Sequence, residues 1–492
     1  MSNEHHVHQP HKQHLTATLF LACMAQFMVI LDVSVVNVAL PSIKHALDFT
    51  EGGLQWVVNA YTVTFAGFLL LGGRAADLLG RRSVFVWGLV LFALASLAGG
   101  LADSRTLLII ARLVQGLGGA VIAPASLSIL TSTFTEPKER HRAIGLWGAM
   151  GGAGGAAGVL LGGVITQALS WRWILFINLP IGLLAAFFSY RLLSESRNEH
   201  ATRNFDVVGA LSATAGLSLL VYGIVRTDTS GWGDTTTLVT IIAGVALLVL
   251  FIGIEGKFAK APLMPLRLFK SRQLSAANLV IGMVGASTFA MWFFLSLYLQ
   301  DVQGYSPLKT GFVFLPMTVL LVICSTIASR ITMKVGPRRL LIAGMLGLAV
   351  GLALFTRISA GGSYLSETLA PSLITSFAMP FAFIPGTICA TSGVAPHEAG
   401  LASAVASTAR LVGGALGLAV LATLATSHSD SLLHHPTAAV HTANQALVSG
   451  FHVAFAVAAG IALFGALISA VGMPRLRPAE AGEPNVQVAV EV

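Results

Sequence analysis

The sequence predicts an all-α integral membrane protein with fourteen membrane-spanning helices, arranged as two six-helix bundles plus two inserted helices. Of its 492 residues, 55% are hydrophobic and only 10% are charged, whereas a soluble domain carries about 25% charged residues. Fourteen apolar stretches are long enough to cross a bilayer, which takes about 20 residues of helix. The two halves of the chain also resemble each other, and internal repeats are typical of transporter folds.

The fourteen apolar stretches follow one another along the whole chain. The first six lie at 15–40, 54–73, 83–102, 106–131, 143–168 and 172–193. Two more follow at 207–226 and 237–255, and the last six lie at 274–299, 310–330, 338–357, 367–392, 400–426 and 450–472. The seventh, eighth and twelfth stretches grade into polar loops at their ends. All are long enough for a spanning helix and too long for an ordinary strand.

Lys and Arg are distributed unevenly between the two sides that these spans define. Short loops rich in these residues stay in the cytoplasm. Most of the 29 lie at the termini or in loops after even-numbered spans. The opposite loops carry only Lys44, Arg105, Arg172, Arg226, Lys309 and Arg357. We therefore expect both termini in the cytoplasm of a bacterial cell, with the protein in its inner membrane. The first span is too long for a cleavable signal and contains Asp32, so it is expected to be retained.

Charge, cysteines and histidines indicate no further partner. The net charge of +8 suits a membrane protein beside an anionic leaflet, and no nucleic acid is expected as a partner. Cys23, Cys324 and Cys389 lie inside spans without a CxxC spacing, so we expect buried free thiols. Histidines gather in "HHVHQPHKQH" and in the loop before the last span, but no spaced ligand set predicts a metal site. No cofactor is expected.

Two motifs of the first half recur in the second. The glycine run that begins at Gly154 recurs at Gly413, and the loop "DLLGRR" (77–82) recurs as "MKVGPRR" (333–339). Both repeats are separated by roughly 260 residues, which fits a duplicated bundle. The predicted organisation is a tail (1–14), a first bundle (15–193), a linker with the two inserted helices (194–273), a second bundle (274–472) and a second tail (473–492).

Motifs of nucleotide-driven pumps and of common hydrolases are missing from the sequence. There is no phosphate-binding GxxxxGK[ST] loop, no HExxH zinc motif and no GxSxG set in a strand-to-helix context. The predicted loops are also too short to hold a catalytic domain. We therefore expect a gradient-driven transporter rather than an enzyme. A lipid translocator and a non-transporting membrane sensor are the alternatives from other classes.

Charged residues inside the predicted spans are the main candidates for function, because an unpaired charge in hydrocarbon is costly. Asp32 lies about 13 Å from the end of its span at Pro41, and Arg112 lies about 10 Å from the end of its span at Arg105. The matching depths predict that Asp32 and Arg112 share a polar pocket in the outer half of the first bundle. The pair either takes up and releases a proton as access alternates, or it is a static contact that fixes helix packing.

Further polar residues within the spans are candidates for a substrate cavity. Arg410 lies near the middle of its span, where it could hold an anionic group, repel protons or bond to helix carbonyls. Gln26 and Asn37 share a face of the first span, and Asn59 and Tyr61 lie in the second. Such polar groups also hold helices together in membranes.

Two groups of aromatic residues complete the candidate cavity. Trp292 lies near the end of a span, where aromatic residues more often form an interfacial belt than a binding cage. Phe377, Phe381 and Phe383 surround Pro380 in the twelfth span. A proline frees helix carbonyls and is tolerated where a helix lines a cavity.

Eight segments resemble, in order, the motif set of one transporter family. Five lie in the first half: "LDVSVVNVALP" (31–41), "GRAADLLGRR" (73–82), "LLIIARLVQGLGGA" (107–120), the glycine stretch (148–163) and "WRWILFINLPIG" (171–182). Three follow: "PLMPLRLF" (262–269), "LQDVQGYSPLKTGFVFLP" (299–316) and "AGLASAVASTARLVGGALG" (399–417). From the first span to the thirteenth, the chain resembles the fourteen-spanner drug:proton antiporters of the major facilitator superfamily. The resemblance implies the major facilitator fold.

The resemblance also implies roles for residues that match the family motifs. Asp32 matches the acid of the first span, and Arg112 and Gln115 match a fourth-span motif linked to proton transfer. The loop that locks the two bundles together in the outward-facing state corresponds to Gly73, Asp77, Gly80, Arg81 and Arg82. Its arginines would equally serve as topology determinants. The antiporter motif of the fifth span corresponds to Gly154, Gly158, Gly162 and Gly163.

One residue departs from the family pattern, which usually has proline after Gly158. This chain has Val159, which keeps the backbone hydrogen bond that proline would remove, so any kink must come from the glycines. Glycines spaced by four let another helix approach closely in a membrane. We expect this glycine face to pack against Gly413, Gly414 and Gly417 of the thirteenth span.

Together these observations predict a proton-coupled exporter that works by alternating access. Its expected partners are the lipid bilayer, protons and a small hydrophobic substrate, either neutral or cationic, and its expected state is a monomer. The proton gradient is the expected energy source. Export rather than import rests on the resemblance. The alternative within this class is a dedicated exporter of one endogenous metabolite or antibiotic.

Overall fold

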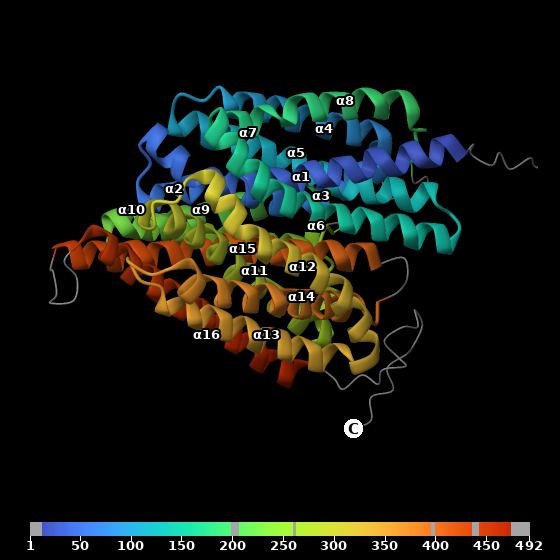
Figure 1. The fold of residues 1–492 in the computed structure, drawn as a ribbon. Coiled ribbons are helices and arrows are strands. Elements are labelled where there is room, and N and C mark those ends of the chain that lie inside the picture. The colour runs from blue at the N-terminus through green and yellow to red at the C-terminus, as the bar shows by residue number, and fades with distance from the viewer. Residues whose placement is uncertain (1–11, 198–205, 259–261, 395–398, 435–441, 474–492) are drawn as a thin grey trace, which may run out of the picture.

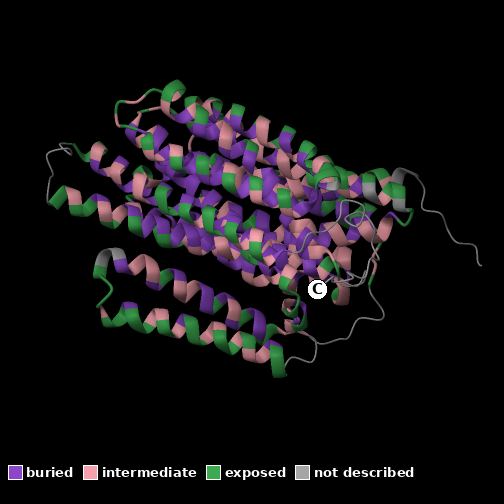
Figure 2. Cartoon of the chain, turned by 90° about the horizontal axis from the view of Figure 1, so that it is seen from below, coloured by how far each residue is buried: buried purple, intermediate pink, exposed green. Residues whose placement is uncertain are grey.

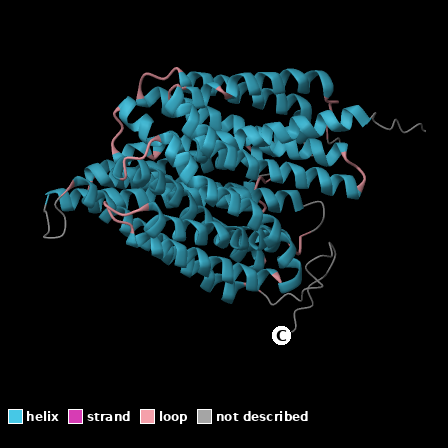
Figure 3. Cartoon of the chain, viewed as in Figure 1, coloured by secondary structure: helices cyan, strands magenta, loops and turns pink. Residues whose placement is uncertain are grey.

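The computed structural model describes residues 12–197, 206–258, 262–394, 399–434 and 442–473. Within these ranges it is built from helices and loops and has no strand (Figure 3). Fourteen helical segments are long and apolar enough to cross a membrane, and they match the fourteen predicted stretches in order. The histidine-rich N-terminal segment and the loop at 435–441 lie largely or wholly outside the described residues.

The helices fall into three groups along the chain (Figure 1). The first comprises α1 (Lys12–Leu47), α2 (Glu51–Leu54), α3 (Trp56–Leu79), α4 (Arg81–Gly100), α5 (Arg105–Thr133), α6 (Pro137–Ala168), α7 (Trp173–Phe176) and α8 (Asn178–Leu192). The second is the pair α9 (Val207–Ser230) and α10 (Thr235–Gly253). The third comprises α11 (Arg272–Leu297), α12 (Pro307–Val335), α13 (Pro337–Leu354), α14 (Leu369–Thr391), α15 (Ala399–His434) and α16 (Ala443–Gly472). Short 3₁₀ or π-helical turns lie at Ile254–Phe258, Leu266–Lys270, Tyr298–Val302, Phe355–Arg357 and Tyr364–Thr368.

Polar residues cap several of these helices. The side chains of Ser104, Ser306 and Asp234 accept main-chain N–H groups in the first turns of α5, α12 and α10. Thr442 and Gln445 form a reciprocal capping box at the start of α16. These side chains satisfy N–H groups that have no partner within the helix. The caps set where the chain leaves each loop and begins a span.

Helix α1 is longer than the sequence predicts. It passes through Pro41 and ends at Leu47, so the predicted end near residue 40 was wrong. With 36 residues it is about 54 Å long, well beyond the roughly 30 Å of bilayer hydrocarbon. Hydropathy registers only the part of a helix within hydrocarbon. Asp32 therefore lies about 22 Å, rather than 13 Å, from the end of its helix.

The two halves of the chain use equivalent helix pairs. In the first half α1 lies along α6, and in the second half α11 lies along α15. The helices α6 and α15 carry the repeated glycine runs. Between the halves, α6 packs on α12 and α15 packs on α3. Figure 1 shows the two six-span groups one above the other, with their helices side by side; we refer to them as the first and second bundles.

The inserted pair packs on one side of the contact between the bundles (Figure 2). Helix α9 contacts both α3 and α15. Val63 of α3, Leu217 and Val221 of α9, and Ala415 and Ala419 of α15 form one buried apolar cluster. Helix α10 packs mainly on α9, and most of its surface is exposed, as expected for a helix that faces lipid.

Candidate functional site

A buried ion pair lies inside the first bundle. Arg112 of α5 donates from Nη1 to Asp32 Oδ2 of α1 at 2.6 Å. The Asp32 side chain is 0% exposed and the Arg112 side chain is 2% exposed. The contact between Asp32 and Arg112, which their matching depths predict, is thus confirmed.

Neutral side chains complete the environment of the Asp32 carboxylate. Gln115, one turn after Arg112 on α5, donates from Nε2 to Asp32 Oδ1 at 2.7 Å and accepts from Arg112 Nη1 at 2.7 Å. Asn178, at the start of α8, donates to the same Oδ1 at 2.8 Å. Three side chains from two helices therefore donate hydrogen bonds to the carboxylate. These donors replace the water molecules that would surround it in solution.

Asn178 and Ser96 are functional candidates that the sequence analysis did not single out. Ser96 of α4 accepts hydrogen bonds from Asn178 at 3.0 Å and Gln115 at 3.2 Å, and donates to the Leu175 carbonyl at 2.8 Å. Both residues are neutral, and neutral polar residues occur in many spans, so their type alone carries little signal. Asn178 lies within the "WRWILFINLPIG" segment at the break between α7 and α8, and that motif was its one available signal.

Arg112 also contacts α3 of the first bundle. Its Nε donates to the Val57 carbonyl at 3.0 Å, and its guanidinium carbon lies 4.4 Å from the centre of the Tyr61 ring. Tyr61 is 2% exposed and Asn59 is 0% exposed. Both cavity candidates are therefore buried, but the Asn59 side chain bonds to Gln55, whereas the Tyr61 ring lies beside Arg112. The Tyr61 hydroxyl has no hydrogen-bond partner among the described residues. We refer to Asp32, Arg112, Gln115, Asn178, Ser96 and Tyr61 as the buried polar cluster.

The arrangement sets a condition on proton binding at Asp32. A proton on this carboxylate would compete with the donors from Arg112, Gln115 and Asn178. No water path to a side chain that is 0% exposed exists without movement of the surrounding helices. Proton exchange at Asp32 therefore requires that α1, α5 and α8 separate locally.

The predicted locking loop is mostly helical, because Gly73 and Asp77 lie within α3 and Arg81 and Arg82 begin α4, with Gly80 between the two helices. Its side chains are held within the first bundle. Asp77 accepts from Arg81 at 3.1 Å and from Ser128 of α5 at 3.4 Å. A Cβ on Gly73 would lie 3.4 Å from Pro124 Cβ, also of α5. In this conformation the contacts of Asp77 and Arg81 thus lie within one bundle. The predicted lock between the two bundles is still a prediction, for the opposite conformation.

Glu195, after the end of α8, is a second residue that the sequence analysis missed. It accepts the main-chain N–H groups of Arg82 and Ser83, each at 3.1 Å. These are free N–H groups at the start of α4, where a negative charge is favourable. Gly80 precedes them with a φ of 115°, a conformation that favours glycine. Glu195 therefore anchors the loop to the last span of its own bundle.

The glycines of α6 allow a close approach by α1. The residues that face α1 are Gly154, Gly158 and Gly162. A Cβ on Gly158 would lie 2.9 Å from the Leu31 carbonyl oxygen and 2.5 Å from Ser34 Cβ. Any side chain there would push the two helices apart. Leu31 and Asp32 are neighbours, so this contact lies directly behind the buried polar cluster.

The prediction that this glycine face packs against α15 was wrong. The glycines of α15 instead face α11, with Gly413 against the main chain of Gly282. Gly163 alone of the predicted motif reaches the second bundle, where a Cβ would lie 2.5 Å from the Pro307 carbonyl of α12. Spacing shows that a helix face permits close approach, but it does not show which helix approaches. Each glycine run mainly serves packing inside its own bundle.

The remaining polar candidates of α1 lie near the contact between the bundles. Gln26 faces α6, where its Nε2 would lie 3.5 Å from a Cβ on Gly151. Its Oε1 is buried without a hydrogen-bond partner among the described residues. Asn37 donates from its side chain to the Val33 carbonyl of its own helix at 3.0 Å. Neither residue joins the buried polar cluster.

The aromatic candidates of the second bundle lie in different environments. Trp292 packs edge-on against Phe314 of α12, with ring centres 5.2 Å apart. Phe381 is buried in an apolar cluster with Cys324, whereas Phe377 is 54% exposed. Arg410 of α15 is half-buried. Its guanidinium lies beside the rings of Phe289 and Phe383 rather than those of Trp292, Phe377 or Phe381.

Hydrogen bonds and an ion pair join the two bundles near Lys44. Lys44 of α1 donates to Asp301 Oδ2 at 2.8 Å and also pairs with Glu51. Ser296 and Gln300 of the second bundle donate to main-chain carbonyls of α1 at 2.6 Å and 2.8 Å. We refer to this end of the molecule as the Lys44 end and to the opposite one as the Arg81 end.

Toward the Arg81 end, helices α6 and α12 part. A Cβ on Gly152 would lie 3.2 Å from Val322 of α12. On the same face of α6, a Cβ on Gly148 or Gly145 would meet no described atom within 4 Å. At the α6–α12 contact, the two bundles therefore lie close together toward the Lys44 end and part toward the Arg81 end.

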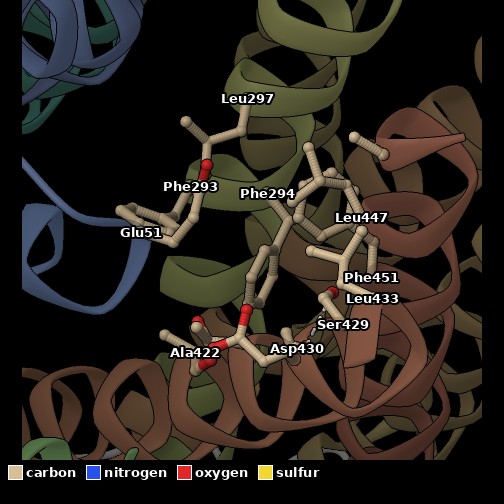
Figure 4. Close-up of a pocket in the computed structure, with 13 residues that line it drawn as sticks. Glu51, Phe293, Phe294, Leu297, Ala422, Ser429, Asp430, Leu433, Leu447 and Phe451 are labelled. Atoms are coloured by element: carbon tan, nitrogen blue, oxygen red, sulfur yellow. Dashed lines mark hydrogen bonds between the residues drawn. The ribbon is translucent and has the colours of Figure 1, made fainter. Parts of the chain in front are cut away.

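A separate pocket of about 200 Å³ lies at the Lys44 end, between α2, α11, α15 and α16 (Figure 4). Phe293, Phe294 and Phe451 give it apolar walls, and Glu51 and Asp430 also line it. Neither end of the buried ion pair lines this pocket. The pocket therefore belongs to the Lys44 end and not to the buried polar cluster.

The sequence of this chain matches one known protein family over most of its length. The model of the Major Facilitator Superfamily matches residues 22–418. The chain belongs to the Major Facilitator Superfamily. It is therefore a multi-pass membrane protein of a transporter superfamily, as the motif resemblance implied, and the two bundles with fourteen spans agree with that membership.

Several curated members of the superfamily are similar over most of this chain. The puromycin resistance protein pur8 of Streptomyces alboniger is 39% identical, over 92% of this chain and 90% of its own length. The cephamycin export protein CmcT of Amycolatopsis lactamdurans is 43% identical, over 83% of this chain and 85% of its own. The multidrug resistance protein Stp of Mycobacterium tuberculosis is 34% identical, over 82% and 74%.

Solved structures of the superfamily share the fold. A bacterial homologue of the human lysosomal transporter Spinster superposes with a TM-score of 0.69 at 15% identity and covers 93% of this chain. The peptide transporter PepTSo superposes with a TM-score of 0.65 at 14% identity. At these identities the likeness concerns the fold alone.

Proposed function

We propose that this protein exports a small hydrophobic compound, such as a drug or an antibiotic, in exchange for protons by alternating access. The buried polar cluster is the observation that carries the proposal, because an ionisable pair inside a bundle is a device for moving protons. The names of the relatives, which refer to antibiotic resistance, drug resistance and export, support an exporter.

Asp32 is the proposed proton carrier. Protonation neutralises the carboxylate and removes the charge that holds Arg112, Gln115 and Asn178 around it. Arg112 keeps its bond to the Val57 carbonyl, so it stays with α3 and α5 while α1 is released. Loss of the proton restores the pair and draws α1 back.

Helix α1 links the proton site to the contact between the bundles. Asp32 faces the first bundle, whereas the carbonyls of Asn37 and Val38, less than two turns later, accept from Ser296 and Gln300 of α11 and the turn that follows it. A shift of α1 on protonation therefore acts directly on the Lys44 end. Coupling between two sites requires an element whose position both sites influence, and α1 is the element that contacts both.

The charge distribution supports an orientation in the membrane, and the names of the relatives support export rather than import. From the positive-inside pattern, we propose that the Arg81 end and both termini lie in the cytoplasm of a bacterial cell, with the protein in its inner membrane. The described conformation then admits substrate from the cytoplasm, and we propose that a monomer carries out the full cycle. One proton that moves down 100 mV yields about 2.3 kcal/mol, enough for a concentration ratio of about fifty.

The first test is the substitution Asp32→Asn, which keeps the shape and removes the titratable group. In everted membrane vesicles, we expect proton-driven uptake of a hydrophobic dye to fall by about a hundredfold, a typical scale for loss of a proton-transfer group. The matched control is Asp103→Asn, which removes an exposed loop carboxylate and is expected to retain uptake. Uptake by Asp32→Asn that still depends on the proton gradient would exclude Asp32 as the carrier.

A dedicated exporter of one compound is the second candidate. Its specific support is that the two relatives with 39% and 43% identity are named for single antibiotics. A panel of dyes and antibiotics in the same vesicles separates the two. Uptake of many unrelated compounds favours a multidrug exporter, and uptake of one compound favours the dedicated exporter.

A further inference from the structure

Arg410 of α15 lies beside two aromatic rings of the second bundle. Its guanidinium carbon lies 5.8 Å from the centre of the Phe289 ring of α11 and 5.6 Å from that of Phe383 of α14. In the described part of the chain, the guanidinium makes no ion pair and no hydrogen bond. Its five N–H donors are therefore left to water or to a ligand.

Arg112 and Arg410 differ in the number of partners that their guanidinium groups have. Arg112 is bound to Asp32, to Gln115 and to the Val57 carbonyl. An arginine in hydrocarbon without such partners is costly and marks a substrate or ion pathway. Arg410 has aromatic rings beside it, but no acid or carbonyl of the described residues bonds to its guanidinium. Helix packing alone does not account for its charge.

The surrounding main chain fixes the position of Arg410. Gly285 of α11 lies directly against the Arg410 carbonyl, and the Phe289 ring lies directly against Gly414. The turn that carries Arg410 is thus pressed on α11. This packing holds the base of the side chain and one of its two rings in place before any ligand arrives, which lowers the entropy that binding costs.

The site also lies where the second bundle meets the first. Leu411, the next residue, is buried in the apolar cluster of the first bundle, and Phe289 packs against that cluster. A ligand held by Arg410 therefore lies close to the contact between the bundles. That is the location expected of a substrate in alternating access.

We propose that Arg410, Phe289 and Phe383 form a subsite for the acidic group of an amphiphilic substrate, so that the exporter prefers hydrophobic anions such as carboxylates. A planar guanidinium binds a carboxylate through two parallel hydrogen bonds. The two phenyl rings contact the apolar body next to that carboxylate. A cationic substrate would instead be repelled by Arg410. This inference rests on the proposed export function and names the substrate class of the same transporter.

The test uses two fluorescent probes that differ in one charge, dansyl-phenylalanine and its neutral amide. Each is titrated against the purified full-length protein in lipid nanodiscs. The wild type is expected to bind the carboxylate about tenfold more tightly than the amide. Arg410→Gln is expected to lose that preference through weaker binding of the carboxylate, with the amide unchanged within about twofold. Arg410→Lys should keep part of the preference, because it retains the charge but not the planar fork.

The control variant is Arg197→Gln, which removes the same charge from an exposed position and should leave both affinities as in the wild type. Equal affinities of the wild type for the two probes would overturn the proposal, as would binding of neither probe. An equal loss of both probes in Arg410→Gln would also overturn it. The wild-type comparison decides the question even where a variant does not fold.

Transport of the same two probes separates this inference from the proposed function. Gradient-dependent uptake of the amide equal to that of the carboxylate, in everted vesicles, would leave the exporter standing and overturn the anionic preference. No gradient-dependent uptake of either probe or of the dye panel would overturn the exporter itself.

Discussion

The buried polar cluster is organised so that every charge has a partner. Asp32 receives three donors, and Arg112 is shared between a carboxylate, an amide and a carbonyl. A buried ion pair of this kind is weak evidence for stability, because desolvation offsets its attraction. Removal of one partner alone is different, because it leaves an uncompensated charge.

Substitution of Arg112 therefore gives a prediction at the scale of single residues. Arg112→Met is expected to lower the free energy of unfolding by about 3–5 kcal/mol, since it leaves the Asp32 carboxylate buried without a countercharge. The double variant Asp32→Asn, Arg112→Met should recover most of that loss. Denaturant unfolding in detergent measures both. Additive losses in the double variant would mean that the two residues are not coupled.

The charged members of the site could be predicted from sequence, whereas its neutral members could not. A charge in a span is rare and needs a partner, so Asp32 and Arg112 stand out and their depths suggest a meeting. Asn178 and Ser96 carry no such signal, because neutral polar residues also join helices throughout a membrane protein. Glu195 was missed because it lies in a polar segment after a span, where an acid is ordinary.

At the scale of elements, α1 serves three neighbours with three faces. One face presents Asp32 to α5, a second receives the glycines of α6, and the end near Asn37 bonds to the second bundle. The packing leaves no space between α1 and α6 at Gly158. In the proposed cycle, we therefore expect a shift of α1 to involve α6 as well.

Gly158→Leu tests that role. The new side chain would meet Ser34 and the Leu31 carbonyl, so we expect α1 and α6 to separate and gradient-driven uptake to fall to roughly a tenth or less, since an overpacked contact must shift its helices. The amount of protein in the membrane should not change. Gly460→Leu, at an exposed position of α16 where a Cβ meets no described atom, is the matched control. Normal uptake by Gly158→Leu would contradict the close-packing role.

The spans themselves could be predicted in number and order, because apolar length reports directly on bilayer thickness. The end of α1 and the partner of the glycine face could not. Pro41 indicates a helix end in a soluble protein, but a spanning helix tolerates it because nearby groups can satisfy the freed carbonyl. The choice of α1 rather than α15 as the partner of Gly158 depends on the three-dimensional arrangement of bundles, which a one-dimensional spacing does not contain.

At the scale of the whole molecule, polar contacts at the Lys44 end add to the apolar cluster that the two bundles share. Among the described residues, Asp301 pairs with Lys44 and lies 3.6 Å from His45, and two hydrogen bonds run from the second bundle to main-chain carbonyls of α1. Partly exposed pairs of this kind contribute about 1 kcal/mol or less each. In the proposed cycle, contacts this weak can break and form again as the conformations exchange.

Asp301→Asn is expected to open the Lys44 end more often. It removes the countercharge of Lys44 on the second bundle and leaves the pair with Glu51 in place. The reporter is Asn37→Cys in a chain whose three cysteines are replaced by alanine, labelled with a membrane-impermeant maleimide. We expect labelling to rise about threefold or more, in line with a loss of about 1 kcal/mol. Asp48→Asn, an exposed residue at the same end, controls for loss of charge. Unchanged labelling in Asp301→Asn would show that this ion pair does not hold the end closed.

The position of the α9–α10 hairpin has a consequence for how a lipid-dissolved compound reaches the transporter. Because α9 bridges α3 and α15, it covers the contact between the bundles on that side. On the α6–α12 side, the helices part toward the Arg81 end. For a compound dissolved in the lipid, we therefore expect approach from the α6–α12 side rather than from the side that α9 covers. The two additional helices would then make access asymmetric within the plane of the membrane.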